Sequence, residues 1–238
     1  MSILEPQYEF VEAGDSKIMK LFPAGTARAV AERELEMTML AKRYGLETPF
    51  VHGIVEVDGR WGLQFDKVLG PTFTQWMVQH PDWLGRLTGY FAHEHHEVHM
   101  HKVPELPRLK EMLAGLLDRE EGLDGDERED LVKKLARMPD GDWLCHMAFV
   151  PESITVSIDG PVVFNWGGAM RGDYIADVAM TSLLLERWTP KPEEKEAVDR
   201  FIDMFRHGYL AEYLKICGRM DEDVDRWKEI IRPVMRTP

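Results

Sequence analysis

Hydrophobic and polar residues alternate in the first part of the chain, as they do in half-buried β-strands. The alternation predicts strands at residues 8–13, 16–22, 51–57 and 61–68. Asp58-Gly59 stands between the last two of these segments, and this dipeptide is typical of a two-residue hairpin turn. We therefore expect a small antiparallel sheet with one helix inserted between its second and third strands.

That helix is expected at residues 26–44, where apolar residues recur with helical spacing. Thr26 is a suitable N-cap, because its hydroxyl can accept a hydrogen bond from the first turn. Gly45 is a C-terminal stop signal, and Pro49 prevents the helix from restarting. The apolar stripe includes Val30, Leu35, Met39 and Leu40.

Beyond Gly70-Pro71 the pattern is mainly helical. Helices are expected at residues 73–79, 83–101, 108–118, 127–137, 175–187, 193–216 and 221–231. A β-hairpin formed by residues 154–157 and 162–164 interrupts them. This order indicates an α+β fold with a small N-terminal lobe at 1–68, a hinge near 66–71 and a large helical lobe at 69–238.

The composition and charge of the chain limit the kinds of molecule that it is expected to bind. The 238 residues are 44% hydrophobic and carry a net charge of −13, which argues against nucleic acid or an anionic membrane and is compatible with a cationic small ligand. No apolar run is long enough to span a bilayer, and we see no targeting leader. The two cysteines suit a reducing compartment, so we expect a cytoplasmic location.

Several short motifs occur in a fixed order. They are Met19-Lys20-Leu21-Phe22, Glu34 in the following helix, Phe65-Asp66-Lys67-Val68, His95-x-x-x-His99, Asp142-Trp143-Leu144-Cys145-His146, Phe164-Asn165-Trp166, Arg171-Gly172-Asp173 and Ala176-Asp177-Val178-Ala179. Together they resemble the aminoglycoside phosphotransferases and their choline-kinase-like relatives over nearly the whole chain. This resemblance implies a protein-kinase-like two-lobed fold.

The resemblance also shows what the chain lacks. The family's catalytic base, its metal-binding Asn and its metal-binding Asp correspond here to Ala148, Ser153 and Asn165. Phosphoryl transfer depends on a positioned carboxylate and on magnesium held by hard oxygen ligands, so their joint loss should cost many decades in rate. Glu152 is expected to point to solvent. The family's Gly-rich turn before the strand lysine is absent as well.

A vestigial nucleotide site is implied by the same resemblance. Lys20 and Glu34 correspond to the phosphate-binding lysine and its ion-pair partner, and Asp66 and Val68 lie in the adenine-binding hinge. We expect Lys20 and Glu34 to form a structural brace between strand and helix. Neither ATP nor magnesium is expected as a cofactor.

Other residues offer chemistry of a different class. His146, Ser153, Asn165 and Asp173 are the catalytic candidates if the cleft now serves another reaction, and Asp173 is equally suited to capping a helix. Asp177 is expected to accept hydrogen bonds from the backbone around His146. Five histidines crowd one helix at positions 93, 95, 96, 99 and 101, but we expect no bound metal, because the third and fourth ligands are not evident.

Three functions remain open from the sequence. The first is a catalytically degenerate kinase-like protein that binds a small molecule, cationic or a biosynthetic intermediate, or a protein partner. The second is a non-kinase enzyme, such as a lyase, cyclase or hydrolase, that reuses the cleft, because function belongs to the site and not to the fold. The third, ranked last, is a weak kinase that has survived the losses.

Overall fold

The computed structural model describes residues 8–188, 196, 199 and 202–235. Close contacts divide the chain into two compact units. We call residues 8–76 and 151–168 the sheet unit, and the remaining described residues the helical unit. The boundary expected at residue 68 stays a prediction, and the segment 151–168 belongs with the sheet unit although it lies far along the chain.

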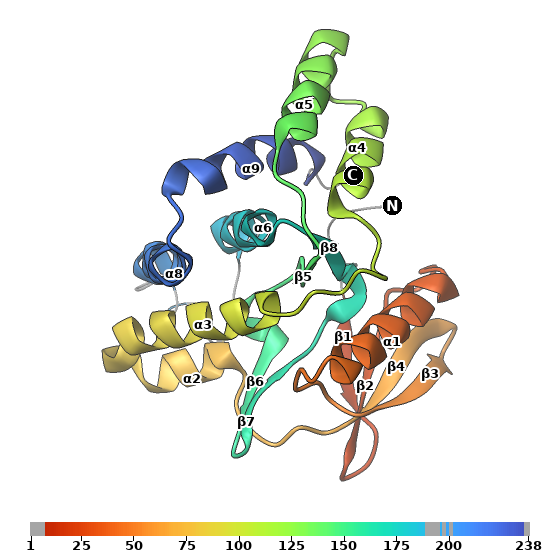
Figure 1. Ribbon diagram of the computed structural model, residues 1–238. Coiled ribbons are helices and arrows are strands. Elements are labelled where there is room, and N and C mark those ends of the chain that lie inside the picture. Colours follow the sequence, from red (N-terminus) through yellow and green to blue (C-terminus); the bar gives the residue numbers. More distant parts are fainter. Residues whose placement is uncertain (1–7, 189–195, 197–198, 200–201, 236–238) are drawn as a thin grey trace. The chain divides into compact units, whose positions relative to one another are not determined.

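The sheet unit contains a four-stranded antiparallel sheet in the order β1-β2-β4-β3. Its strands are β1 (Glu9–Glu12), β2 (Lys17–Leu21), β3 (Val51–Val57) and β4 (Arg60–Asp66), as Figure 1 shows in red to orange. The predicted hairpin turn is confirmed, since Asp58 and Gly59 both have positive φ, of 51° and 70°. The strand pattern of the sequence was therefore a sound guide to this sheet.

Helix α1 (Arg28–Arg43) packs on the sheet around Phe22, Ala31, Leu63 and Phe65. Two details of the prediction were wrong. Ala27, not Thr26, is the N-cap, and it forms no side-chain cap. Met39 is 51% exposed, because the buried face runs through Ala31, Glu34, Met37, Thr38, Leu40 and Ala41.

The hairpin expected near residue 159 is confirmed as β6 (Ile154–Ser157) and β7 (Gly160–Val163). It is tied to the rest of the sheet unit by backbone hydrogen bonds from Val163 N–H to Glu47 O at 2.9 Å and from Val156 N–H to Pro71 O at 2.9 Å. Short 3₁₀ turns precede and follow it at Pro151–Ser153 and Trp166–Gly168. This arrangement brings Ser153 and Asn165 into the same unit as Lys20.

The helical unit is built mainly from helices that the sequence predicts. They are α3 (Leu84–His99), α4 (Leu109–Arg119), α5 (Gly125–Arg137), α6 (Tyr174–Arg187), α8 (Ile202–Cys217) and α9 (Asp221–Val234). A further helix, α2 (Phe73–Gln79), contains the unit boundary. The N-terminal part of the helix expected at 193–216 lies outside the described residues. None of the helices among the described residues is long and apolar enough to cross a membrane.

Two short strands complete the helical unit. β5 (Trp143–Cys145) pairs antiparallel with β8 (Met170–Gly172), which the sequence did not predict. Helix α3 packs against α8, and α6 packs against α9; in Figure 1, α8 and α6 are seen end-on while α3 and α9 lie across the view. The α+β class is confirmed. Two of these elements position candidate site residues. β5 ends at Cys145, directly before His146, and α6 begins directly after Asp173.

Candidate functional site

Lys20 and Glu34 form the ion pair that the sequence predicts. Lys20 Nζ lies 2.8 Å from both carboxylate oxygens of Glu34, and the two residues are only 1% and 2% exposed. The pair joins β2 to the buried face of α1. A buried charge of this kind is stable only while its partner remains in place.

Asn165 takes the third hydrogen bond of the same ammonium group. Its Oδ1 accepts from Lys20 Nζ at 2.9 Å. Its amide nitrogen donates to Ser153 Oγ at 3.2 Å and to Tyr8 Oη at 2.6 Å. Asn165 has φ of 65°, a left-handed conformation that Asn tolerates better than most residues. Asn165 therefore bonds to both Lys20 and Ser153; the resemblance in sequence equates Asn165 and Ser153 with the family's metal ligands.

Tyr8 is the residue of this cluster that sequence reasoning missed. Its ring centroid lies 4.0 Å from Lys20 Nζ, which is cation–π geometry, and its ring also packs edge-on to Phe10. Phe10 in turn packs against Phe164, next to Asn165. Tyr8 and Asn165 are 157 positions apart in the sequence, so no local pattern joins them.

The other candidates of the sheet unit lie at its margins. Asp66 is at the end of β4, where its carboxylate is bonded to His52 at 2.6 Å and its backbone N–H donates to Phe50 O at 2.9 Å. Val68 follows in an irregular, half-buried segment. The expectation that Glu152 points to solvent was wrong, because Glu152 is half-buried and accepts a hydrogen bond from Thr74 Oγ1 at 2.9 Å.

Residues 146–148 form the loop that follows β5 in the helical unit. The carboxylate of Asp177 accepts hydrogen bonds from the backbone N–H of His146 at 2.5 Å and of Met147 at 2.8 Å, which confirms the bracing role predicted for Asp177. His146 is fully buried, and its Nδ1 accepts from Ala148 N–H at 3.2 Å. Ala148 offers only a methyl group at the position of the family's base.

His95 and His99 hold the same carboxylate from the other side. Their Nε2 atoms lie 3.2 and 3.0 Å from Asp177 Oδ2, and their Nδ1 atoms lie 2.7 and 2.6 Å from the hydroxyls of Tyr209 and Tyr213. The Nε2 atoms therefore donate to Asp177 while the Nδ1 atoms accept from the tyrosines. This network links α3, α6 and α8 beneath the loop.

Burial sets the protonation of this network. Desolvation, helped by the neighbouring His99, lowers the pKa of His95 to about 3, so His95 is neutral at physiological pH. Burial alone would raise the pKa of Asp177, but the hydrogen bonds from His95 and His99 hold it well below its usual range. Burial also raises the pKa of Tyr209 well above normal. The result is a buried Asp177 anion beside a neutral His95.

The histidine pair and Asp177 also have the residue types of a metal site. Their ligand atoms lie within 4.8 Å of one another. However, each imidazole nitrogen already has a hydrogen-bond partner, and Asp177 also accepts two backbone N–H groups. The hydrogen-bonded network accounts for the arrangement without an ion.

Asp173 serves as the helix cap that the sequence offered as one of its two roles. It is the N-cap of α6, and one carboxylate oxygen accepts from Ile175 N–H at 3.3 Å. The other accepts from the indole N–H of Trp227 at 3.0 Å, so Asp173 faces α9. Cys145 is fully buried, and burial raises the pKa of its thiol.

Comparisons with known proteins agree with the resemblance seen in the motifs. The model of the phosphotransferase enzyme family (APH) matches residues 4–222. No match was found among curated proteins.

Solved structures with the same fold span nearly the whole chain. An aminoglycoside-3'-phosphotransferase of type VIII is 15% identical with a TM-score of 0.59, and the match covers 96% of this chain and 94% of that one. APH(3'')-Id from Streptomyces rimosus, in complex with ADP and streptomycin, is 17% identical with a TM-score of 0.58, over 97% and 93%. These likenesses confirm the kinase-like fold.

Proposed function

Because the chain belongs to the APH phosphotransferase enzyme family, we propose that it is a member that no longer transfers phosphate. It acts instead by binding a small molecule or a protein partner through the cleft that the family uses for catalysis. The proposal assigns Lys20, Glu34, Asp66 and Val68 to a vestigial nucleotide site, and Ala148, Ser153 and Asn165 to positions that have lost their chemistry.

The observation that carries the proposal is the state of the Lys20 ammonium group. An ammonium has three N–H donors, and Lys20 directs them at the two oxygens of Glu34 and at Asn165 Oδ1, at 2.8 to 2.9 Å. The group is 1% exposed and lies beneath the ring of Tyr8. A phosphate could reach it only by displacing these bonds in a buried site, which is costly.

The residues also fit magnesium poorly. Magnesium favours one or two carboxylates together with phosphate oxygens. Asn165 offers one neutral carbonyl oxygen, which already accepts from Lys20, and Ser153 is a hydroxyl that accepts from Asn165. The chain therefore lacks the negative charge that would hold the ion at these positions.

Ala148 argues in the same direction from the helical unit. The backbone of its loop is still braced by Asp177, but the methyl group of Ala148 cannot accept or orient a proton. General-base groups contribute about a hundred- to ten-thousand-fold to rate. Retention of the brace without the base is what we expect of a scaffold that has kept its fold and given up the reaction.

The ligand is expected to be small and polar. One related structure contains ADP and streptomycin, and the net charge of −13 favours a cationic ligand for this chain. The rival hypothesis, a non-kinase enzyme built on His146, finds no specific support. His146 is fully buried with Nδ1 already bonded, and Asp173 is committed to capping α6.

The test is a measurement of phosphoryl transfer. Purified protein is incubated with magnesium and γ-labelled ATP, with and without streptomycin as acceptor, and ADP and labelled acceptor are quantified. We expect no turnover above the rate without protein. Turnover that scales with protein concentration and disappears in a Lys20→Met/Glu34→Met variant would overturn the proposal. That variant replaces both charges of the ion pair, so a folded protein can be compared with wild type.

A further inference from the structure

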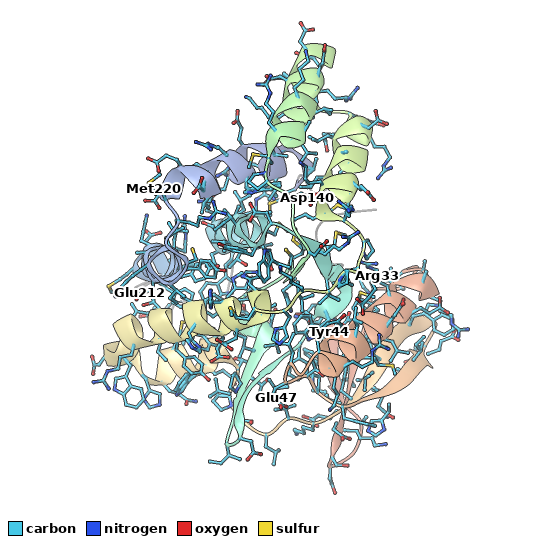
Figure 2. The ribbon with its side chains drawn as sticks, in the orientation of Figure 1. Arg33, Tyr44, Glu47, Asp140, Glu212 and Met220 are labelled. Carbon is cyan, nitrogen blue, oxygen red and sulfur yellow. The ribbon has the colours of Figure 1, made fainter. Side chains whose placement is uncertain are left out.

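A cavity of about 370 Å³ lies in the helical unit, on the side of α9 that faces the end of α5. Its walls come from the last turn of α5 and the residues after it, from the turn before α9, and from α9 itself. Met220 and Asp140, the sequence neighbours of Arg219 and Pro139 in these walls, are labelled in Figure 2. The volume is in the range of small-molecule sites.

The cavity is separate from the loop at His146. None of its lining residues belongs to residues 146–153. The strands β5 and β8 pair antiparallel, with Trp143 opposite Gly172 at one end and Cys145 opposite Met170 at the other. Asp173, which lines the cavity, follows Gly172 at the first end, whereas the loop at His146 follows Cys145 at the second end. A ligand here would not occupy the positions at which the family performs its reaction.

The acidic side chains of the cavity are already engaged. Glu229 accepts from Lys134 Nζ at 2.6 Å, which neutralises that lysine. Asp173 is 6% exposed, and its two oxygens are bonded to the Ile175 N–H and the Trp227 indole. These carboxylates are therefore poorly placed to bind a cation in the cavity.

The arginines, in contrast, have donors to spare. Arg219 and Arg226 share the carboxylate of Asp223, at 3.8 and 3.9 Å, which is beyond hydrogen-bonding distance. Arg219 also donates one hydrogen bond, from Nε to Tyr174 Oη at 3.5 Å, which leaves its other N–H groups for a ligand. Arg137 is exposed and forms no ion pair or hydrogen bond with the described residues. Three guanidinium groups thus line the cavity, and Asp223 forms only long ion pairs with two of them. The chain as a whole has a net charge of −13, so this local excess of positive charge is not a general property of its surface.

The rest of the lining is apolar. Met138 and Pro139 form its accessible part, and Trp227 and Ile230, which are 1% and 0% exposed, lie behind them. Guanidinium groups bind carboxylates through paired, charge-assisted hydrogen bonds. An apolar wall beside them would cover the hydrocarbon part of the same molecule.

We propose that this cavity is a second ligand site that binds a small organic carboxylate with an apolar or aromatic body. Arg137, Arg219 and Arg226 hold the carboxylate, and Met138 and Pro139 contact the body, with the buried Trp227 behind them. This inference does not depend on the proposed loss of phosphoryl transfer.

Three probes of the same size test the charge preference. They are 1-naphthoate, 1-naphthalenemethanol and 1-naphthylmethylamine, titrated separately into ¹⁵N-labelled full-length protein. The indole N–H signal of Trp227, assigned with a Trp227→Phe variant, reports occupancy of the cavity. We expect 1-naphthoate to shift this signal with a Kd of about 1 mM, the alcohol to bind about tenfold more weakly, and the amine to leave the signal unchanged.

Matched variants locate the site. Arg137→Ala/Arg226→Ala should weaken 1-naphthoate binding about tenfold or more. Lys133→Ala/Arg86→Ala removes the same charge from exposed positions outside the cavity and should leave the affinity unchanged. Equal binding of the three probes, a Trp227 signal that does not move, or equal effects of the two double variants would overturn the proposal.

Discussion

The cluster around Asn165 in the sheet unit and the loop at His146 in the helical unit differ in how their residues are engaged. In the sheet unit, Asn165 bonds to Lys20, Ser153 and Tyr8, and the Tyr8 ring lies over Lys20, so the residues proposed to correspond to the family's phosphate and metal ligands are engaged with their neighbours. In the helical unit, Asp177 braces the backbone of the loop, and Ala148 contributes only a methyl group.

The difference indicates which family residues carry structure and which carry chemistry. Asp177 is fully buried and joins three helices to the loop, so its loss would damage the fold whether or not the protein reacts. A base at Ala148 would have no such structural task. Lys20 lies between these cases, because its partner Glu34 is buried and would be left without a counter-charge.

The largest expected effect comes from breaking the support under the loop. Asp177→Asn removes the charge and turns an amide N–H group toward donors that now point at a carboxylate. Loss of several charge-assisted bonds should lower the free energy of unfolding by about 5 kcal/mol, measured by urea denaturation. Asp225→Asn, an exposed control on α9, should stay within about 0.5 kcal/mol of wild type. A similar small change in Asp177→Asn would refute the structural role.

The ion pair of the sheet unit should respond less when both partners are changed together. Lys20→Met alone leaves Glu34 buried and uncompensated, and should cost about 3 kcal/mol. Lys20→Met/Glu34→Met should recover most of that loss, because a buried pair can be replaced by apolar residues of similar volume. The double-mutant cycle is measured by urea denaturation, and purely additive losses would contradict a bracing role.

A fall in pH should destabilise the helical unit because His95 becomes protonated more easily in the unfolded chain. Its pKa is lowered on folding to about 3, so the unfolded chain takes up this proton first as the pH falls. Stability from the neutral ring is complete above about pH 6.5 and declines by about 1.4 kcal/mol per pH unit below it. The lowered pKa of Asp177 affects stability only when the pH falls to near the ordinary carboxyl pKa of about 4, which is below the range tested. Unfolding between pH 6.5 and 4.5 should show this slope, and His95→Gln should remove it. An equal slope in that variant would show that other groups are responsible.

The smallest expected change in stability comes from substitutions of Tyr8, which contacts both Lys20 and Asn165. Tyr8→Phe keeps the ring over Lys20 and removes one hydrogen bond to Asn165, so it should cost about 1 kcal/mol. Tyr8→Leu also removes the cation–π contact and should cost a further 0.5–1 kcal/mol, roughly. If the two variants are equally stable in thermal denaturation, the ring over Lys20 contributes nothing measurable.

The sequence predicted the parts of this molecule that depend on local pattern or on short motifs. The strands of the sheet, the hairpin turn at Asp58 and the Lys20–Glu34 pair are confirmed. The stripe on α1 was misplaced because Met39 is apolar yet exposed, and periodicity alone does not identify the covered face. β8 was missed because three residues are too few to show a period.

The composition of the site was harder to predict than its position. The contact of Tyr8 with Asn165 joins residues 157 positions apart. The bond between Glu152 and Thr74 joins residues 78 positions apart. Such contacts depend on tertiary packing, and neither residue stands in a pattern that points to the other. Asp177 was predictable only because the family motif around it identifies its task.

Calorimetric titration of the full-length protein with ATP in excess magnesium tests the central claim most directly. If Glu34 and Asn165 occupy the Lys20 ammonium group as the structure shows, wild type should show no binding tighter than about 1 mM. A micromolar Kd that is lost in the folded Lys20→Met/Glu34→Met variant would contradict the account.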